Sequence, residues 1–110
     1  MEEIIKALRE FDAKRNWNEY DLVQTEEQTI EALYKSLVHL MGEIGEFANE
    51  LKKCRRDNNF NEQNLKEELV DTFIFLQKIA LTLKMDLKEE TLRKISINEE
   101  RFKHFIKDGN

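Results

Sequence analysis

Two pairs of carboxylates lie at spacings that helices would bring together. Glu43 and Glu46 are three residues apart, and so are Glu68 and Asp71. On a helix, each pair lies on one side with its members about one turn apart, so four acids could converge on one site. Like charges at short range repel strongly in a partly dry site. The cluster therefore either binds cations or does not form.

The ligand type determines which cation such a site would prefer. Oxygen donors favour Mg²⁺ or Mn²⁺ over zinc, and four carboxylates are more than one Mg²⁺ usually takes from protein. The surplus indicates two or more ions with phosphate completing their shells, as in metal-assisted phosphoryl transfer. The alternative is an ion-pair network with nearby basic residues. Spacing alone leaves both open, because 23 acids in one chain form such pairs by chance.

Four further residues are candidates for substrate binding. Lys94, Asn98 and Arg101 follow one another at spacings of four and three, so they share one face of a predicted helix. They form either a solvated stripe or a grip on phosphate oxygens. Trp17 lies in a predicted loop, where it is either a lid over an apolar gap or a stacking platform for a base.

Helices must position these residues, and the composition favours helices. The 110 residues are 40% hydrophobic and 37% charged, with no proline and three glycines. We expect an all-α fold in one domain over residues 1–110, arranged as a four- to five-helix bundle. Helical periodicity and capping patterns predict helices over these ranges: 2–14, 25–55, from Asn61 or Asn64 to 83, and 86–107.

The predicted third helix is apolar on nearly every side. A monomer of this size has too few elements to cover it, so we expect a homodimer or homotetramer to complete the core. Two glycines, Gly42 and Gly45, interrupt the second helix. They indicate either a close approach by another helix or a ligand, or a tolerated kink.

Charge and composition exclude several classes of function. A net charge of −5 and a pI near 5.2 argue against binding duplex nucleic acid through its phosphates. The sequence shows no signal peptide and no apolar run long enough for a membrane, and its single cysteine, Cys54, cannot form an internal disulfide. We expect a cytoplasmic protein without a membrane partner. Neither His39 nor His104 forms a Glu-x-x-His pair, which argues against a di-iron bundle.

Residues 33–102 resemble the MazG-like, all-α nucleoside triphosphate pyrophosphohydrolases. The signature of that family is Glu-x-x-Glu followed, after a gap, by Glu-x-x-Asp, and both acid pairs match it with residues 47–67 between them. Gly45 precedes the second Glu, as in the usual Gly-Glu form. Lys94, Asn98 and Arg101 resemble the family's phosphate-side motif. The early Arg15-x-Trp17 is similar to the variant found in the dCTP-hydrolysing branch.

The resemblance implies a function for each candidate. Its implied metal ligands for Mg²⁺, or Mn²⁺, are Glu43, Glu46, Glu68 and Asp71. Glu43 or Glu46 would position or deprotonate the attacking water, and Lys94, Asn98 and Arg101 would contact the triphosphate. The implied reaction converts a nucleoside triphosphate and water to the monophosphate and pyrophosphate, in a homodimer or dimer of dimers whose site combines subunits.

Three other interpretations stay open at this point. Phosphoribosyl-ATP pyrophosphohydrolase is a close chemical relative, which the Trp17 loop and the long leading helix disfavour. A non-catalytic helical interaction module would use the apolar repeat of the second helix to bind a partner. A nucleotide sensor would bind without turnover, although the presence of all four acids gives no sign of lost catalysis.

Overall fold

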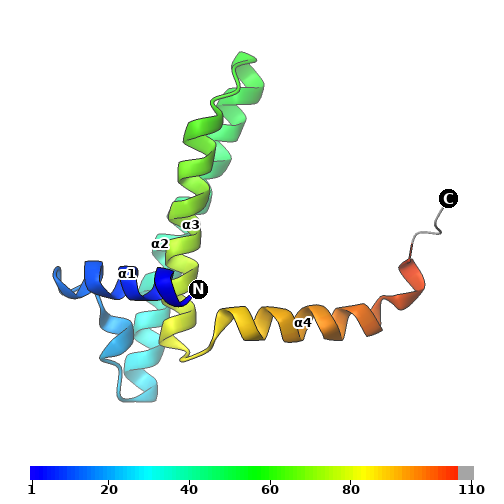
Figure 1. The fold of residues 1–110 in the computed structure, drawn as a ribbon. Coiled ribbons are helices and arrows are strands. Elements are labelled where there is room, and N and C mark those ends of the chain that lie inside the picture. Colours follow the sequence, from blue (N-terminus) through cyan, green and yellow to red (C-terminus); the bar gives the residue numbers. More distant parts are fainter. Residues whose placement is uncertain (107–110) are drawn as a thin grey trace.

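The computed structural model describes residues 1–106, which contain helices and no strand (Figure 1). The elements are α1 (Glu2–Ala13), η1 (Glu19–Asp21), α2 (Glu26–Asp57), α3 (Glu62–Thr82), α4 (Leu87–Arg101) and η2 (Lys103–Phe105), where η denotes a 3-10 turn. The predicted all-α class is confirmed. The fourth helix ends earlier than predicted, because the chain changes to a 3-10 turn after Arg101. Residue 107 lies outside the described residues.

The helices begin where the capping residues predict. Thr25 precedes α2, and its Oγ1 accepts the Gln28 N–H at 3.0 Å, while Gln28 Oε1 accepts the Thr25 N–H at 3.3 Å. Asn61 caps α3 by accepting the Asn64 N–H at 3.3 Å, which decides between the two predicted caps. Asp86 caps α4 in the same way at 3.1 Å.

The long helices α2 and α3 form a hairpin, and this hairpin is the frame of the molecule (Figure 1). The chain leaves α2 through Asn58, which adopts left-handed backbone angles of φ 50° and ψ 41°. Asparagine tolerates this conformation better than most residues, so Asn58 can end α2 and begin the short turn that leads to α3. The middle of α2 therefore faces the middle of α3, which is where the two acid pairs lie.

The core is small, and apart from Leu65 in the first turn of α3 it lies at the end of the hairpin against which η1 packs. Its buried apolar residues come from η1, α2 and α3, and they are Tyr20, Ala32, Leu65, Ala80 and Leu81. The segment η1 packs against both α2 and α3. Asp12 of α1 forms an ion pair with Lys78 of α3, which joins α1 to the hairpin.

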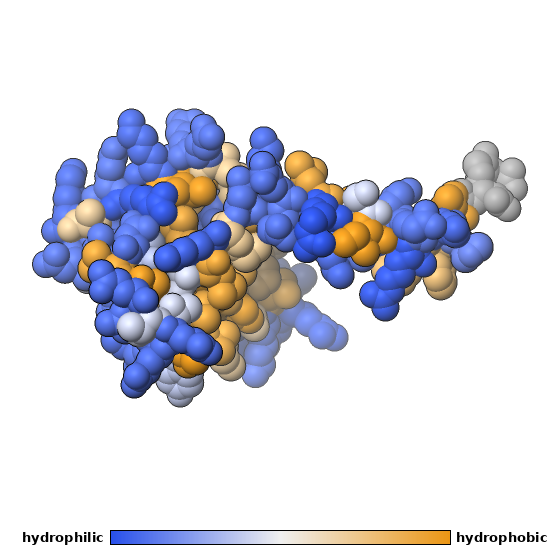
Figure 2. Space-filling model, turned by 90° about the horizontal axis from the view of Figure 1, so that it is seen from below, coloured by the Kyte–Doolittle hydropathy of each residue, from blue (hydrophilic) through white to orange (hydrophobic). Residues whose placement is uncertain are grey.

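Helix α4 projects away from the hairpin (Figure 1). Within residues 1–106 its one extensive contact is with η2, its own continuation. Apolar side chains on it are left exposed, including Leu92 and Ile95. Figure 2 shows hydrophobic side chains along this arm as well as on the compact part of the molecule. A helix is stabilised mainly by packing of its apolar face, and residues 1–106 leave much of this face on α4 uncovered.

Candidate metal centre

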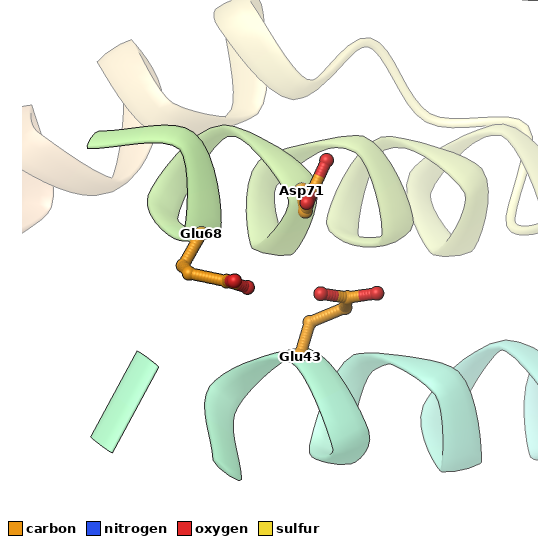
Figure 3. Close-up of side chains that lie close together, drawn as sticks. All are labelled: Glu43, Glu68 and Asp71. Carbon is orange, nitrogen blue, oxygen red and sulfur yellow. The ribbon is translucent and has the colours of Figure 1, made fainter. Parts of the chain in front are cut away.

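Three of the predicted ligands meet between the two long helices. Glu43 of α2 and Glu68 and Asp71 of α3 each offer a carboxylate oxygen, and these atoms lie within 4.8 Å of one another. Glu43 and Glu68 extend into the space between the helices, and Asp71 lies one turn along α3 from Glu68 (Figure 3). Residue spacing on each helix and the antiparallel pairing of the hairpin together produce this arrangement.

Two oxygen atoms in the cluster have no partner. Oε2 of Glu43 and Oε2 of Glu68 are buried and accept no hydrogen bond from residues 1–106. Among residues 1–106, no lysine or arginine forms an ion pair with any of the four candidate acids. Buried carboxylate oxygens without donors are costly unless a proton or a cation satisfies them. The ion-pair network that spacing left open is therefore absent from this part of the chain.

Glu46, the fourth candidate, lies at the exposed edge of the cluster. Burial raises the pKa of Glu43, and the charges of Glu46 and Asp71 raise it further. His39 opposes this shift. The pKa of Glu68 is also raised, first by burial and then by the neighbouring carboxylate of Glu46. The site thus disfavours the ionised forms of Glu43 and Glu68 until positive charge enters it.

This repulsion predicts how stability without metal depends on pH. The ordinary pKa of a glutamate is 4.5, and folding raises it for Glu43 and Glu68. These two groups therefore bind protons more tightly in the folded chain than in the unfolded chain, so their contribution to stability is largest below that value and is lost as pH rises through the raised pKa. We expect the melting temperature in chelator to fall more steeply above about pH 4.5 for the native chain than for Glu43→Gln. Parallel pH profiles for the two chains would contradict this expectation.

The cluster offers carboxylate oxygens as ligands, and hard divalent cations prefer oxygen ligands. The oxygens of Glu43 and Glu68 that lack a hydrogen bond belong to two of the carboxylates that such an ion would take as ligands. The two neighbouring glycines do not serve packing within the chain, because a Cβ at Gly42 or Gly45 would meet no atom within 4 Å. The residues that the structure describes therefore make no close approach to these glycines, and a tolerated glycine within the helix and an approach by another molecule both stay open.

The substrate-binding candidates do not join the acids within one chain. Lys94, Asn98 and Arg101 lie on α4, which extends away from the hairpin; Lys94 and Arg101 are exposed and Asn98 is half-buried. Trp17 lies in the loop between α1 and η1 and is 57% exposed. Its ring contacts Phe11 at a centroid distance of 6.2 Å. The acids are thus assembled by one chain, and the remaining candidates are not.

Sequence reasoning missed a second polar cluster. Asp12 is fully buried, and its Oδ2 accepts a hydrogen bond from the Tyr20 hydroxyl at 2.6 Å and lies 3.3 Å from Lys78 Nζ. Burial and the Asp12 carboxylate raise the pKa of Tyr20, so this hydroxyl stays protonated and donates. A signal for it existed, because Asp12 continues the helical spacing of the apolar residues Ile5 and Leu8.

Comparison with known proteins adds two matches. The model of a family described as dUTPase matches residues 2–108. The chain is also similar to dCTP pyrophosphatase 1 of Mus musculus, with 27% identity over 118 residues that cover 100% of this chain and 63% of that protein. The chain thus spans less than two thirds of the length of this curated relative. No solved structure matches the chain. None of the helices in residues 1–106 is long and apolar enough to cross a membrane.

Proposed function

Because the chain belongs to the dUTPase family, we propose that it is a divalent-metal-dependent pyrophosphohydrolase of nucleoside triphosphates. The products would be the nucleoside monophosphate and pyrophosphate. One observation carries the proposal: three carboxylates meet within 4.8 Å, two of their oxygens are buried without a partner, and no basic side chain of residues 1–106 pairs with them. An acidic cluster without internal neutralisation is suited to a cation and, through it, to an anionic substrate.

Glu43, Glu68 and Asp71 would hold the metal, with Glu46 as a fourth ligand from the exposed edge. Mg²⁺ is the expected ion and Mn²⁺ the expected substitute, because both prefer carboxylate and phosphate oxygens. When bound, the metal neutralises charge on the phosphates and lowers the pKa of a coordinated water.

The acids on α2 have a second role in this proposal. Glu43 and Glu46 lie about one turn apart on the same side of the helix, so one can bind metal while the other faces the attacking water. We assign to them the orientation of that water and the acceptance of its proton at a carboxylate oxygen.

A second copy of the chain is the partner that completes the site. Lys94, Asn98 and Arg101 carry two positive charges and an amide, which can bind the oxygens of a triphosphate. The helix that carries them, α4, extends away from the hairpin of the same chain (Figure 1). Docking α4 on the hairpin of another copy would cover the apolar faces of both. It would also bring positive charge toward a cluster that lacks it. We therefore propose a homodimer, or a homotetramer built from such dimers, in which each site combines two subunits.

The names of the family and of the mouse relative direct the choice of nucleotide. The family name refers to dUTP and the name of the mouse relative to dCTP, so deoxypyrimidine triphosphates are the first substrates to test. Trp17 would stack on the base, since an exposed aromatic ring binds bases through their faces.

A nucleotide panel tests the proposed function. The protein is incubated with Mg²⁺ and each of the common ribo- and deoxyribonucleoside triphosphates, and the products are separated and quantified. We expect monophosphate and pyrophosphate in equal amounts, with the fastest turnover for dCTP or dUTP. Release of orthophosphate, or absence of turnover across the panel, would contradict the proposal.

A further inference from the structure

One buried residue fixes the loop that carries Trp17. Asp12 is the last acid of α1 and is 0% exposed. Its backbone carbonyl accepts the N–H of Arg15 at 3.0 Å and the N–H of Trp17 at 2.9 Å. Oδ2 of its carboxylate contacts Tyr20 and Lys78, while Oδ1 is buried without a hydrogen-bond partner among residues 1–106. Asp12 thus joins the loop to the rest of the fold through both its main chain and its side chain.

The loop has a defined conformation at this junction. Asn16 adopts a left-handed conformation with φ 58°, and its N–H donates to the Ala13 carbonyl at 3.3 Å. Together with the bond from Trp17 to Asp12, this is the pair of hydrogen bonds that ends many helices in a Schellman motif. The contact between the Trp17 and Phe11 rings is the apolar contact that commonly accompanies the motif. The backbone of Trp17 is therefore fixed relative to Asp12.

The side chain of Asp12 extends this anchor to α3. Oδ2 accepts the Tyr20 hydroxyl at 2.6 Å and pairs with Lys78 Nζ at 3.3 Å, and the Lys78 side chain is only 13% exposed. Buried ion pairs commonly add less stability than apolar residues of the same size. The pair is thus better suited to defining one arrangement of α1 on α3 than to stabilising the fold.

Helix α3 connects this anchor to the acidic cluster. Lys78 follows Asp71 by seven residues, which places both on one face of the helix, about 10 Å apart along its axis. Between them lies Phe75, whose ring is 5.0 Å from Lys78 Nζ and stacks on His39 of α2 at 5.1 Å. His39 in turn precedes Glu43 by one turn. Packed groups therefore connect the Trp17 loop with both helices of the cluster.

We propose that Asp12 is a positioning residue for substrate binding, which holds the Trp17 loop at a fixed place relative to the metal-binding acids. This inference rests on the proposed function, in which Trp17 stacks on the base. A rigid platform reduces the entropy lost when the substrate binds, so loosening the anchor weakens binding more than it slows the chemical step.

Tyr20→Phe is the main test, because it removes one hydroxyl and leaves the pair of Asp12 with Lys78 in place. Asp12→Asn is the stronger variant, and Asp57→Asn, which alters an exposed pair with Arg56 at the far end of the hairpin, is the matched control. Steady-state kinetics give KM and kcat, and acrylamide quenching of fluorescence reports on Trp17, the single tryptophan of the chain.

We expect Tyr20→Phe to raise KM about threefold or more, to leave kcat within about twofold, and to increase quenching of Trp17. The control should match the native chain. Unchanged KM and unchanged quenching would overturn the proposal, as would a lower kcat at unchanged KM. If the Asp12→Asn protein does not fold, the KM and the quenching of Tyr20→Phe alone test the proposal. Should the native chain show no turnover, the proposed function fails, and the quenching measurement still decides whether Asp12 fixes the loop.

Discussion

Glu68→Gln is expected to lower kcat by roughly 10³-fold while making the metal-free protein more stable. Glutamine preserves the size of the side chain but cannot supply an ionised oxygen to a metal. The same change removes a carboxylate whose buried Oε2 lacks a partner and whose pKa is raised by burial and by Glu46, so repulsion in the empty site decreases. Turnover at saturating Mg²⁺ and melting temperature in chelator measure the two effects.

The opposite signs of these effects distinguish a metal ligand from a structural residue. For the native chain, a free Mg²⁺ concentration 100 times Kd should add about 2.7 kcal/mol of stability, and Glu68→Gln should lose most of this gain. Glu62→Gln is the matched control, because it removes an exposed carboxylate of the same helix that pairs with Lys66. A Glu68→Gln protein that keeps its turnover, or that melts lower than the native chain in chelator, would contradict the assignment.

Mixing two inactive variants is expected to restore activity. If α4 of one subunit completes the acidic cluster of the other, Glu43→Gln and Arg101→Ala chains damage opposite halves of each shared site. Random pairing makes half of the dimers mixed, and each mixed dimer regains one intact site of two, so about one quarter of native activity should return. Co-expression with two affinity tags and double purification isolate the mixed dimers, and in that fraction about one half of native activity is expected.

A mixture of two variants that each lack one acid of the cluster is the control for that experiment. Glu43 and Glu68 belong to the same cluster in the same chain, so mixing Glu43→Gln with Glu68→Gln should restore nothing. Recovery in both mixtures would indicate an unrelated effect of mixing. An inactive mixture of Glu43→Gln with Arg101→Ala, in which mixed dimers have been isolated, would contradict a site shared between subunits.

Local physical rules predict much of this fold from the sequence. Thr25, Asn61 and Asp86 cap their helices in the structure, because capping depends on side chains within three residues of the helix start. The meeting of Glu43 with Glu68 and Asp71 was predicted from spacing, since helical periodicity and one short turn suffice to place them. Their role as metal ligands stays a prediction.

Longer-range features were beyond the same reasoning. The position of α4 depends on what it packs against, and periodicity states only that one of its faces is apolar. The buried group of Asp12, Tyr20 and Lys78 joins segments far apart in the chain, so no local pattern announces it, apart from an acid at an apolar position of α1. The end of α4 at Arg101, before the predicted 107, shows that an apolar pattern continues readily from a helix into a 3-10 turn.

The central claim is that the acids between α2 and α3 bind a divalent metal together with a nucleotide. Electron paramagnetic resonance of free Mn²⁺ measures this directly, with an α,β-imido deoxypyrimidine triphosphate present to prevent cleavage at the proposed bond. After correction for Mn²⁺ held by the nucleotide alone, the native chain and Glu62→Gln should deplete free Mn²⁺ equally, and Glu68→Gln should deplete little. Equal depletion by all three proteins, or depletion by none, would contradict the claim.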